Sequence, residues 1–127
     1  MKVEVPLGDV VDKVSILRIK LEKIGSENVQ KELDSLLSSW ESEDLPPLYA
    51  LPQYRPLAAV NRKLWDVEDA LRQLESDNRF DTHFVALARS VYKLNDERAA
   101  LKRAINVDLG SDLIEEKSYP VTSKTNR

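Results

Sequence analysis

The sequence predicts an all-α protein: a four-helix bundle-like fold with a long antiparallel hairpin of its last two helices and a proline-rich ordered loop. Two observations predict this class. Apolar residues recur at spacings of three and four residues over four separate segments, and residues that cap or end helices stand between those segments. A chain of 127 residues can bury one core without disulfides or metals. We therefore expect a single helical domain over residues 1–120 and a flexible C-terminal tail over residues 121–127.

The first helix is expected over residues 9–24. Asp9 can cap its first turn, and Gly25 follows as a residue suited to the left-handed conformation that ends helices. Ile16 and Ile19 fall outside the main apolar stripe, which indicates a second buried side and suggests a subunit contact. The main stripe consists of residues spaced four, three, four and three apart: Val10, Val14, Leu17, Leu21 and Ile24.

The second helix is expected to begin at Ser26 and to end before Asp44. One of its faces carries Val29, Leu33, Leu36, Leu37 and Trp40. The segment that follows, residues 44–56, contains prolines at positions 46, 47, 52 and 56, which exclude a regular helix. The same segment is rich in leucine and tyrosine. We therefore expect an ordered loop that packs across the bundle.

The third and fourth helices are expected over residues 56–75 and 81–106. Pro56 suits the first turn of the third helix, where a missing N–H costs nothing. Asp81 can cap the fourth helix, with Phe80 and Val85 as a hydrophobic staple. At 1.5 Å per residue the fourth helix is roughly 38 Å long. A short connection between two long helices makes them antiparallel neighbours.

The composition narrows the classes of function. The formal net charge is −3, which disfavours general binding to nucleic acid because that binding draws its affinity from Lys and Arg. There is no cysteine and only one histidine, so we expect no metal and no cofactor. We find no signal peptide and no apolar run of about 20 residues that could span a bilayer, so we expect a cytoplasmic protein without membrane contact.

Polar side chains interrupt the apolar face of the helix over residues 81–106. Asn95, Arg98 and Lys102 fall inside that face on a helical wheel. An unpaired buried charge costs several kcal/mol by rough estimate, so these residues must be paired, reach water or meet a ligand. Glu68 lies at the margin of the stripe on the preceding helix. One interpretation is therefore an ion pair of Glu68 with Arg98 or Lys102 between antiparallel neighbours.

The other interpretation of this polar seam is an anion pocket. Arg98 and Lys102 would bind a carboxylate or a phosphate, and Asn95 would fix its orientation. Lys13 on the first helix flanks its apolar stripe and could add a charge. A cationic clamp alone can catalyse a rearrangement by electrostatic preorganisation, so the sequence leaves open whether the protein is an enzyme.

A basic strip on the outer side of the same helix is a weaker candidate. Arg89, Lys93 and Arg103 could contact nucleic acid. Asp96 and Glu97 are interleaved with them, a pattern typical of a solvated face with ion pairs one turn apart. The sequence therefore favours the ion pair and the anion pocket over nucleic-acid binding.

Several short segments resemble an uncharacterised bacterial family of short helical proteins, one of the domains of unknown function. The resemblance covers most of the chain and implies no assigned reaction. It depends on residues 4–6 with Gly8, 11–13, 65–69, 84–92, 95–98, 102–106 and 110–119.

A second similarity, of architecture only, is to the all-α chorismate mutases. Their pockets place Arg and Lys side chains around a dicarboxylate, and Asp12, Ile16 and Arg18 with the seam at Arg98 and Lys102 are similar in layout. The N-terminal arginine characteristic of those enzymes is absent here, with Lys13 at best in its place. A shared fold does not imply a shared function.

Two functions compete at this point. The first is a helical protein–protein interaction or accessory module that self-associates, expected as a homodimer because apolar residues such as Ile16, Ile19 and Trp65 exceed the needs of one seam per helix. The alternative is a protein or enzyme that binds a small carboxylate or phosphate with Asn95, Arg98, Lys102, Glu68 and Lys13.

Overall fold

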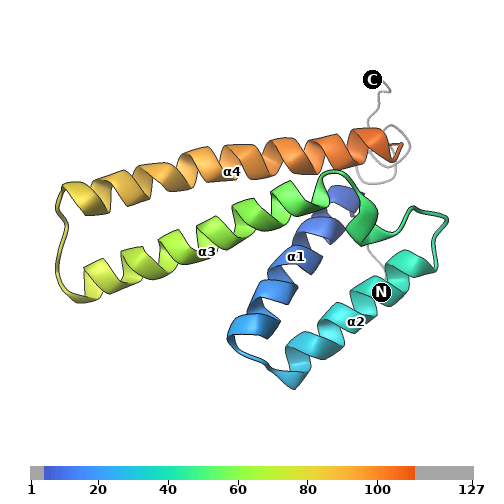
Figure 1. Ribbon diagram of the computed structural model, residues 1–127, viewed down its shortest axis with the longest axis horizontal. Helices are drawn as coiled ribbons and strands as arrows, with labels where there is room; N and C mark the ends of the chain where they lie inside the picture. Colours follow the sequence, from blue (N-terminus) through green and yellow to red (C-terminus); the bar gives the residue numbers. More distant parts are fainter. Residues whose placement is uncertain (1–4, 111–127) are drawn as a thin grey trace.

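The computed structural model describes residues 5–110 and contains four α-helices within them (Figure 1). The predicted all-α fold and the long hairpin are confirmed, and the tail predicted over residues 121–127 lies outside the described residues. The elements in chain order are α1 (Leu7–Lys23), α2 (Glu27–Glu41), the short 3-10 helix η1 (Leu48–Ala50), α3 (Tyr54–Ser76) and α4 (Thr82–Asp108).

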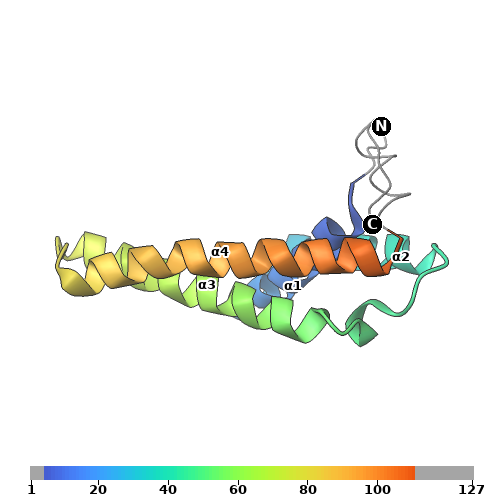
Figure 2. The same cartoon turned by 90° about the horizontal axis from the view of Figure 1, so that it is seen from above.

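The four helices do not form a bundle of equal partners. α3 and α4 lie side by side along their length, whereas α1 packs against both of them at one end only and α2 packs on α1. The turn between α3 and α4 extends well beyond α1 and α2 in both views (Figures 1 and 2). We call the covered end of the hairpin the base half, and residues 65–76 of α3 with 82–95 of α4 the tip half.

Most helix ends form where the sequence places them. The Ser26 hydroxyl accepts a hydrogen bond from the Asn28 N–H at 3.1 Å, and the Asp81 carboxylate accepts one from the Phe84 N–H at 3.2 Å. Gly25 adopts φ +70°, the left-handed conformation that favours glycine at a helix end. The predicted cap at Asp81, the start of the second helix at Ser26 and the glycine stop are confirmed.

One local prediction was wrong. α1 begins at Leu7 after Pro6, so Asp9 lies inside its first turn instead of capping it. A carboxylate in this place is still favourable because it lies near the positive end of the helix dipole. At the start of α4 the Phe80 ring packs on Phe84 with centroids 5.2 Å apart, and Val85 is 45% exposed. The staple between Phe80 and Val85 stays a prediction.

The proline-rich segment is an ordered loop, as expected. Leu48 and Leu51 join the main core cluster with residues of α1, α2 and α3. The Trp40 indole N–H donates to the Pro46 carbonyl at 2.8 Å, which ties the end of α2 to the loop. The prolines prevent a helix, and the apolar side chains between them hold the segment against the core.

α1 is buried on two sides. Its second side is a row of residues spaced four, three and four apart, all buried: Gly8, Asp12, Ser15 and Ile19. Ile19 is only 2% exposed within this single chain, so the subunit contact expected from it was wrong. Most side chains in this row are short or polar. Short side chains let α1 approach α3 and α4 closely.

Candidate functional site

The strongest polar contact in the described structure joins the first helix to the last. The Asp12 carboxylate on α1 is 5% exposed and faces Arg98 on α4. Arg98 donates from Nε to Asp12 Oδ1 at 2.9 Å and from Nη2 to Oδ2 at 2.5 Å. This two-pronged geometry is the strongest arrangement available to a guanidinium and a carboxylate.

α3 completes the contact. The Asn61 amide Nδ2 donates to Asp12 Oδ1 at 2.9 Å and to the Ser15 hydroxyl at 2.7 Å. Ser15 in turn donates to the backbone carbonyl of Asp12 at 2.8 Å. Three helices thus meet at one carboxylate, and Asp12, Ser15 and Asn61 each have a hydrogen-bond partner, as a low-dielectric interior requires.

Burial and pairing act in opposite directions on Asp12. Burial raises the pKa of the Asp12 carboxyl. Hydrogen bonds from Arg98 and Asn61, together with the charges of Arg98 and Lys102, lower it by more, so the pKa lies below its ordinary value. The same contact raises the pKa of Arg98. Both groups are therefore charged at neutral pH, and the site is an internal ion pair.

The start of α1 adds two contacts to α4 beside this pair. Lys102 Nζ lies 3.1 Å from Asp9 Oδ1, and the Gly8 N–H donates to the Asn106 side-chain oxygen at 2.7 Å. A Cβ atom on Gly8 would lie 2.4 Å from the Lys102 carbonyl oxygen, far inside contact distance. Glycine is thus required here because the two backbones touch.

The structure separates the residues of the predicted seam. Arg98 and Lys102 lie together under α1, but they pair with Asp12 and Asp9, so the expected pairing with Glu68 was wrong. Glu68 and Asn95 are exposed in the tip half. The Asp12 hydrogen bond is the main cause of the raised pKa of Arg98, and the charge of Glu68 adds to it without forming a salt bridge. Lys13 pairs with Glu32 of α2 at 3.0 Å, on another side of α1.

Sequence reasoning missed Asp12 as the partner of Arg98. The signal was present in the row of Gly8, Asp12, Ser15 and Ile19, which share one face of α1. Ile19 is the one large apolar residue in this row. Asn61 lies on the face of α3 that should meet this row. A carboxylate amid short residues on a helix that needs a second buried side would have pointed to the pair.

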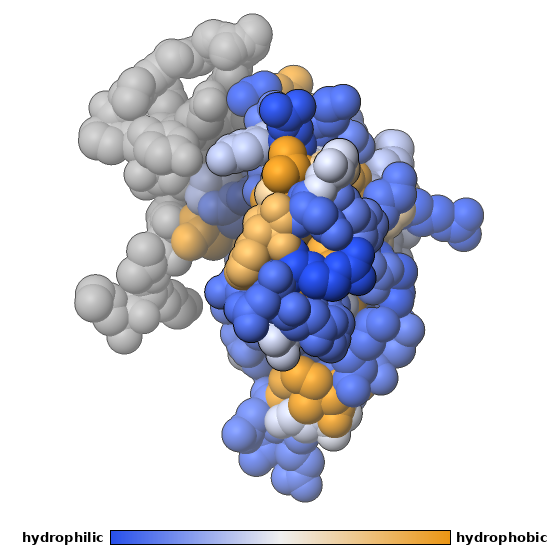
Figure 3. All heavy atoms as spheres, turned by 90° about the vertical axis from the view of Figure 1, so that its left-hand side faces the viewer, coloured by the Kyte–Doolittle hydropathy of each residue, from blue (hydrophilic) through white to orange (hydrophobic). Residues whose placement is uncertain are grey.

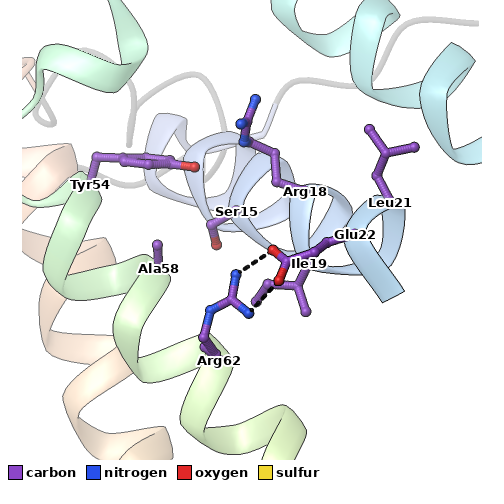
Figure 4. Close-up of a pocket in the computed structure, with 8 residues that line it drawn as sticks. All are labelled: Ser15, Arg18, Ile19, Leu21, Glu22, Tyr54, Ala58 and Arg62. Carbon is purple, nitrogen blue, oxygen red and sulfur yellow. Dashed lines mark hydrogen bonds and ion pairs between the residues drawn. The ribbon is translucent and has the colours of Figure 1, made fainter. Parts of the chain in front are cut away.

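A cleft of about 390 Å³ lies between α1 and α3 (Figure 4). Ser15, Ile19 and Ala58 line it together with the charged pair Arg62 and Glu22, which are joined by hydrogen bonds of 2.8 and 3.1 Å. These hydrogen bonds lower the pKa of the Glu22 carboxyl. Arg62 and Glu22 are exposed, so the contact acts as a tie between two helices at the surface.

Arg18 borders the same cleft and is held by aromatic residues of the loop. Its guanidinium lies 5.1 Å from the centre of the Tyr49 ring and donates to the Tyr49 hydroxyl at 3.2 Å. The Tyr49 ring packs edge-on against Tyr54, with centroids 5.0 Å apart. Both arginines of the cleft are thus engaged by the chain's own side chains.

The tip half is covered less than the base half. Of the elements in residues 5–110, only α3 and α4 lie there, and two of its aromatic side chains face solvent: Tyr92 is 75% exposed and Phe80 57% exposed. Trp65 and Phe84 are half-buried. Figure 3 looks at the molecule from the hairpin's end and shows apolar surface breaking through hydrophilic surroundings. Exposed aromatic side chains are enriched at protein contact sites.

Among residues 5–110, no group of three or more His, Asp or Glu side chains is placed to hold a metal ion. None of the helices in that range is long and apolar enough to cross a membrane.

Comparison with known proteins gives one match. The model of DUF6165, a family of unknown function, matches residues 1–126. The chain belongs to this family. No curated protein and no solved structure matches it. The resemblance to an uncharacterised family is thereby confirmed, and the similarity to the all-α chorismate mutases stays an expectation drawn from architecture.

Proposed function

We propose that this DUF6165 member is a helical protein–protein interaction module that self-associates through the tip half of its α3–α4 hairpin. The observation that carries the proposal is the uncovered hairpin itself. α1 and α2 end at the base half, and α3 and α4 continue beyond them as a layer of two helices (Figures 1 and 2). A helix buries its apolar stripe against other elements, and two helices alone leave part of each stripe open.

The exposed residues support this use of the tip half. Tyr92 and Phe80 are aromatic, a residue class enriched at the centre of protein interfaces because it buries much area at little loss of side-chain entropy. The base half supports the same proposal in another way. The Asp12–Arg98 pair fixes α1 across both hairpin helices, so the tip half projects from a rigid support.

Light scattering on the purified chain tests the proposal. We expect a dimer mass at micromolar concentration, and we expect Tyr92→Asp to shift the chain to a monomer. Val107→Asp is the matched control, because Val107 is also an exposed apolar residue of α4 but lies in the base half. A strict monomer at high concentration, or equal effects of the two substitutions, would contradict self-association through the tip half.

A small anion bound at the seam is the second candidate. Arg98 keeps 30% of its side chain exposed and Lys102 keeps 29%, so a carboxylate or phosphate could reach both cations by displacing Asp9. Glu68, Asn95 and Lys13 would contribute only if they moved from their present places. A melting-temperature screen with phosphate and dicarboxylates tests this candidate. No rise with any of them, for the wild type or for Asp9→Ala, would refute it.

We also place this module in the cytoplasm. The chain contains no cysteine, which suits a reducing compartment. Detection of the tagged full-length protein in fractionated cells would test that location.

A further inference from the structure

We infer that the occupant of the tip half is a second copy of this chain, laid antiparallel so that the two tips overlap and the two bases point apart. The inference rests on the proposed self-association and names its geometry. It follows from which face is open, from what α1 blocks, and from how the side chains repeat about one point of the hairpin.

The open face is the continuation of the face that α1 covers. On α3, Asn61 contacts α1, and residues 4, 7 and 11 positions further on share its side of the helix. On α4, Arg98 and Lys102 contact α1, and the same side continues toward the tip. We call this surface the tip face, and it consists of Trp65, Glu68, Arg72, Phe84, Ala88, Tyr92 and Asn95.

α1 decides the direction of the partner. α1 covers the same side of the hairpin in the base half, and it is about 10 Å thick with its side chains. Two copies placed face to face with their bases at the same end would be held apart by two α1 helices, and their tips could not touch. With the bases at opposite ends, each tip half fits the space next to the partner's α1.

A two-fold axis through the middle of the tip half follows from the hairpin's numbering. The turn is centred near Arg79, so Ala70 on α3 and Ala88 on α4 lie at the same level, each nine residues away. Both alanines are at the middle of the tip half, whose α3 part is about 18 Å long at 1.5 Å per residue. Overlap of two tip halves is therefore greatest when the axis passes at this level.

Residues of α4 complement themselves about that axis. Ala88 meets the partner's Ala88, and a short side chain at the crossing point lets two helices approach closely. Phe84 and Tyr92 lie four residues to either side, so Phe84 meets the partner's Tyr92 and Tyr92 meets the partner's Phe84. Phe84 is half-buried and Tyr92 is 75% exposed, so the contact would cover the most exposed aromatic ring of α4.

Residues of α3 complement themselves in charge. Glu68 and Arg72 lie two residues to either side of the Ala70 level, so Glu68 meets the partner's Arg72 and Arg72 meets the partner's Glu68. Both side chains are exposed. Arg72 is bonded to Asp69 at 2.5 Å within α3, and an exposed pair of this kind is easily exchanged or shared. A symmetric dimer of this geometry thus places opposite charges together twice.

Charge reversal tests the arrangement. Glu68→Arg and Arg72→Glu should each weaken the dimer about tenfold or more, because each turns two attractions into two repulsions. An equimolar mixture of the two variants should recover wild-type affinity as a heterodimer, and the double variant should recover it as a homodimer. Asp66→Arg, an exposed carboxylate of α3 outside the tip face, is the matched control and should leave the affinity within about twofold.

A cysteine at the axis gives an independent test, since the chain has no cysteine of its own. Ala88→Cys should be joined to its partner by a short bis-maleimide, whereas Arg103→Cys in the base half of α4 should not. If the wild type is a dimer but the charge variants do not rescue each other and Ala88→Cys does not cross-link, the antiparallel arrangement is overturned and self-association stands. A monomeric wild type overturns both.

Discussion

The two halves of the α3–α4 hairpin are built alike and covered differently. Both have an apolar seam between the helices, where Leu94 packs with Val60 and Leu64, and Val67, Val91 and Leu101 pack against them. In the base half, α1 lies across the seam and supplies Asp12 to the polar residues beside it. In the tip half, the same face continues with Glu68 and Asn95 open to solvent.

The difference shows what a polar residue next to a helix seam can mean. Arg98 has a structural role because a third helix, α1, places the Asp12 carboxylate against it. Glu68 lies two turns from Asn61 toward the tip of α3. Its carboxylate faces solvent because no element of the described chain covers it. We expect stability to depend on the base half and on the seam between α3 and α4, and association to depend on the exposed face of the tip half.

Removal of the Asp12 carboxylate should have the largest effect on stability. Asp12→Ala leaves the Arg98 charge without its partner and the Asn61 amide with one acceptor fewer, so we expect a loss of about 3 kcal/mol in the free energy of unfolding. Urea denaturation followed by circular dichroism measures it.

The double variant Asp12→Ala with Arg98→Met is the control for that loss. It removes both charges, so it should be more stable than Asp12→Ala alone by roughly 1–3 kcal/mol. If the double variant is as unstable as the sum of the two single variants, the pair is not the reason for the loss.

Much of this architecture could be predicted from the sequence. The start of α2 at Ser26, the cap at Asp81 and the stop at Gly25 depend on local chemistry, and all three formed where the pattern placed them. Asp9 was misplaced because a competing local feature, Pro6, starts the helix earlier. Local rules thus fixed the elements to within a few residues.

The candidate site was only half predictable. Periodicity alone identified Arg98 and Lys102 as charges on an apolar face, but it does not say which helix packs across that face. Asp12 and Arg98 are 86 positions apart, and α1 reaches α4 only because Gly8 allows backbone contact. Nothing in the spacing along α3 showed that α1 would cross α3 at Asn61 and leave Glu68 uncovered.

Gly8→Ala should give the next largest effect. The added methyl group would lie 2.4 Å from the Lys102 carbonyl oxygen, which is backbone and cannot rotate away. α1 must then shift, and we expect a loss of about 1–3 kcal/mol, measured as a lower melting temperature. Gly110→Ala is a poor match because of its positive φ, so Ser39→Ala, an exposed residue inside α2, serves as the control and should be nearly neutral. Equal stability of Gly8→Ala and wild type would show that α1 does not touch α4 as described.

Acidification should weaken the base half through Asp12. The pKa of its carboxyl is lower in the folded chain than its ordinary value of 3.8, so the folded state favours the ionised form. That contribution is fully present above the unfolded pKa and is lost as the pH falls through the folded pKa. We expect the stability advantage of wild type over Asp12→Asn to be constant above about pH 5 and to shrink below about pH 4. An advantage that does not change between neutral and acid pH would contradict an ionised Asp12 in the folded chain.

The smallest effect on stability is expected on the exposed surface of the tip half, and it separates that surface from the seam between α3 and α4. Tyr92 is 75% exposed, so Tyr92→Ser should change the free energy of unfolding of the dilute monomer by less than about 0.5 kcal/mol. Leu94, two residues away and 8% exposed, faces α3, and Leu94→Ala should cost about 2–4 kcal/mol in the same measurement. At higher concentration Tyr92→Ser should lose the stabilisation that association gives to wild type, since a partner that binds only the folded state raises stability by mass action. A large loss for Tyr92→Ser even at high dilution would mean that this ring supports the hairpin itself, and the tip half would then be a structural region like the base.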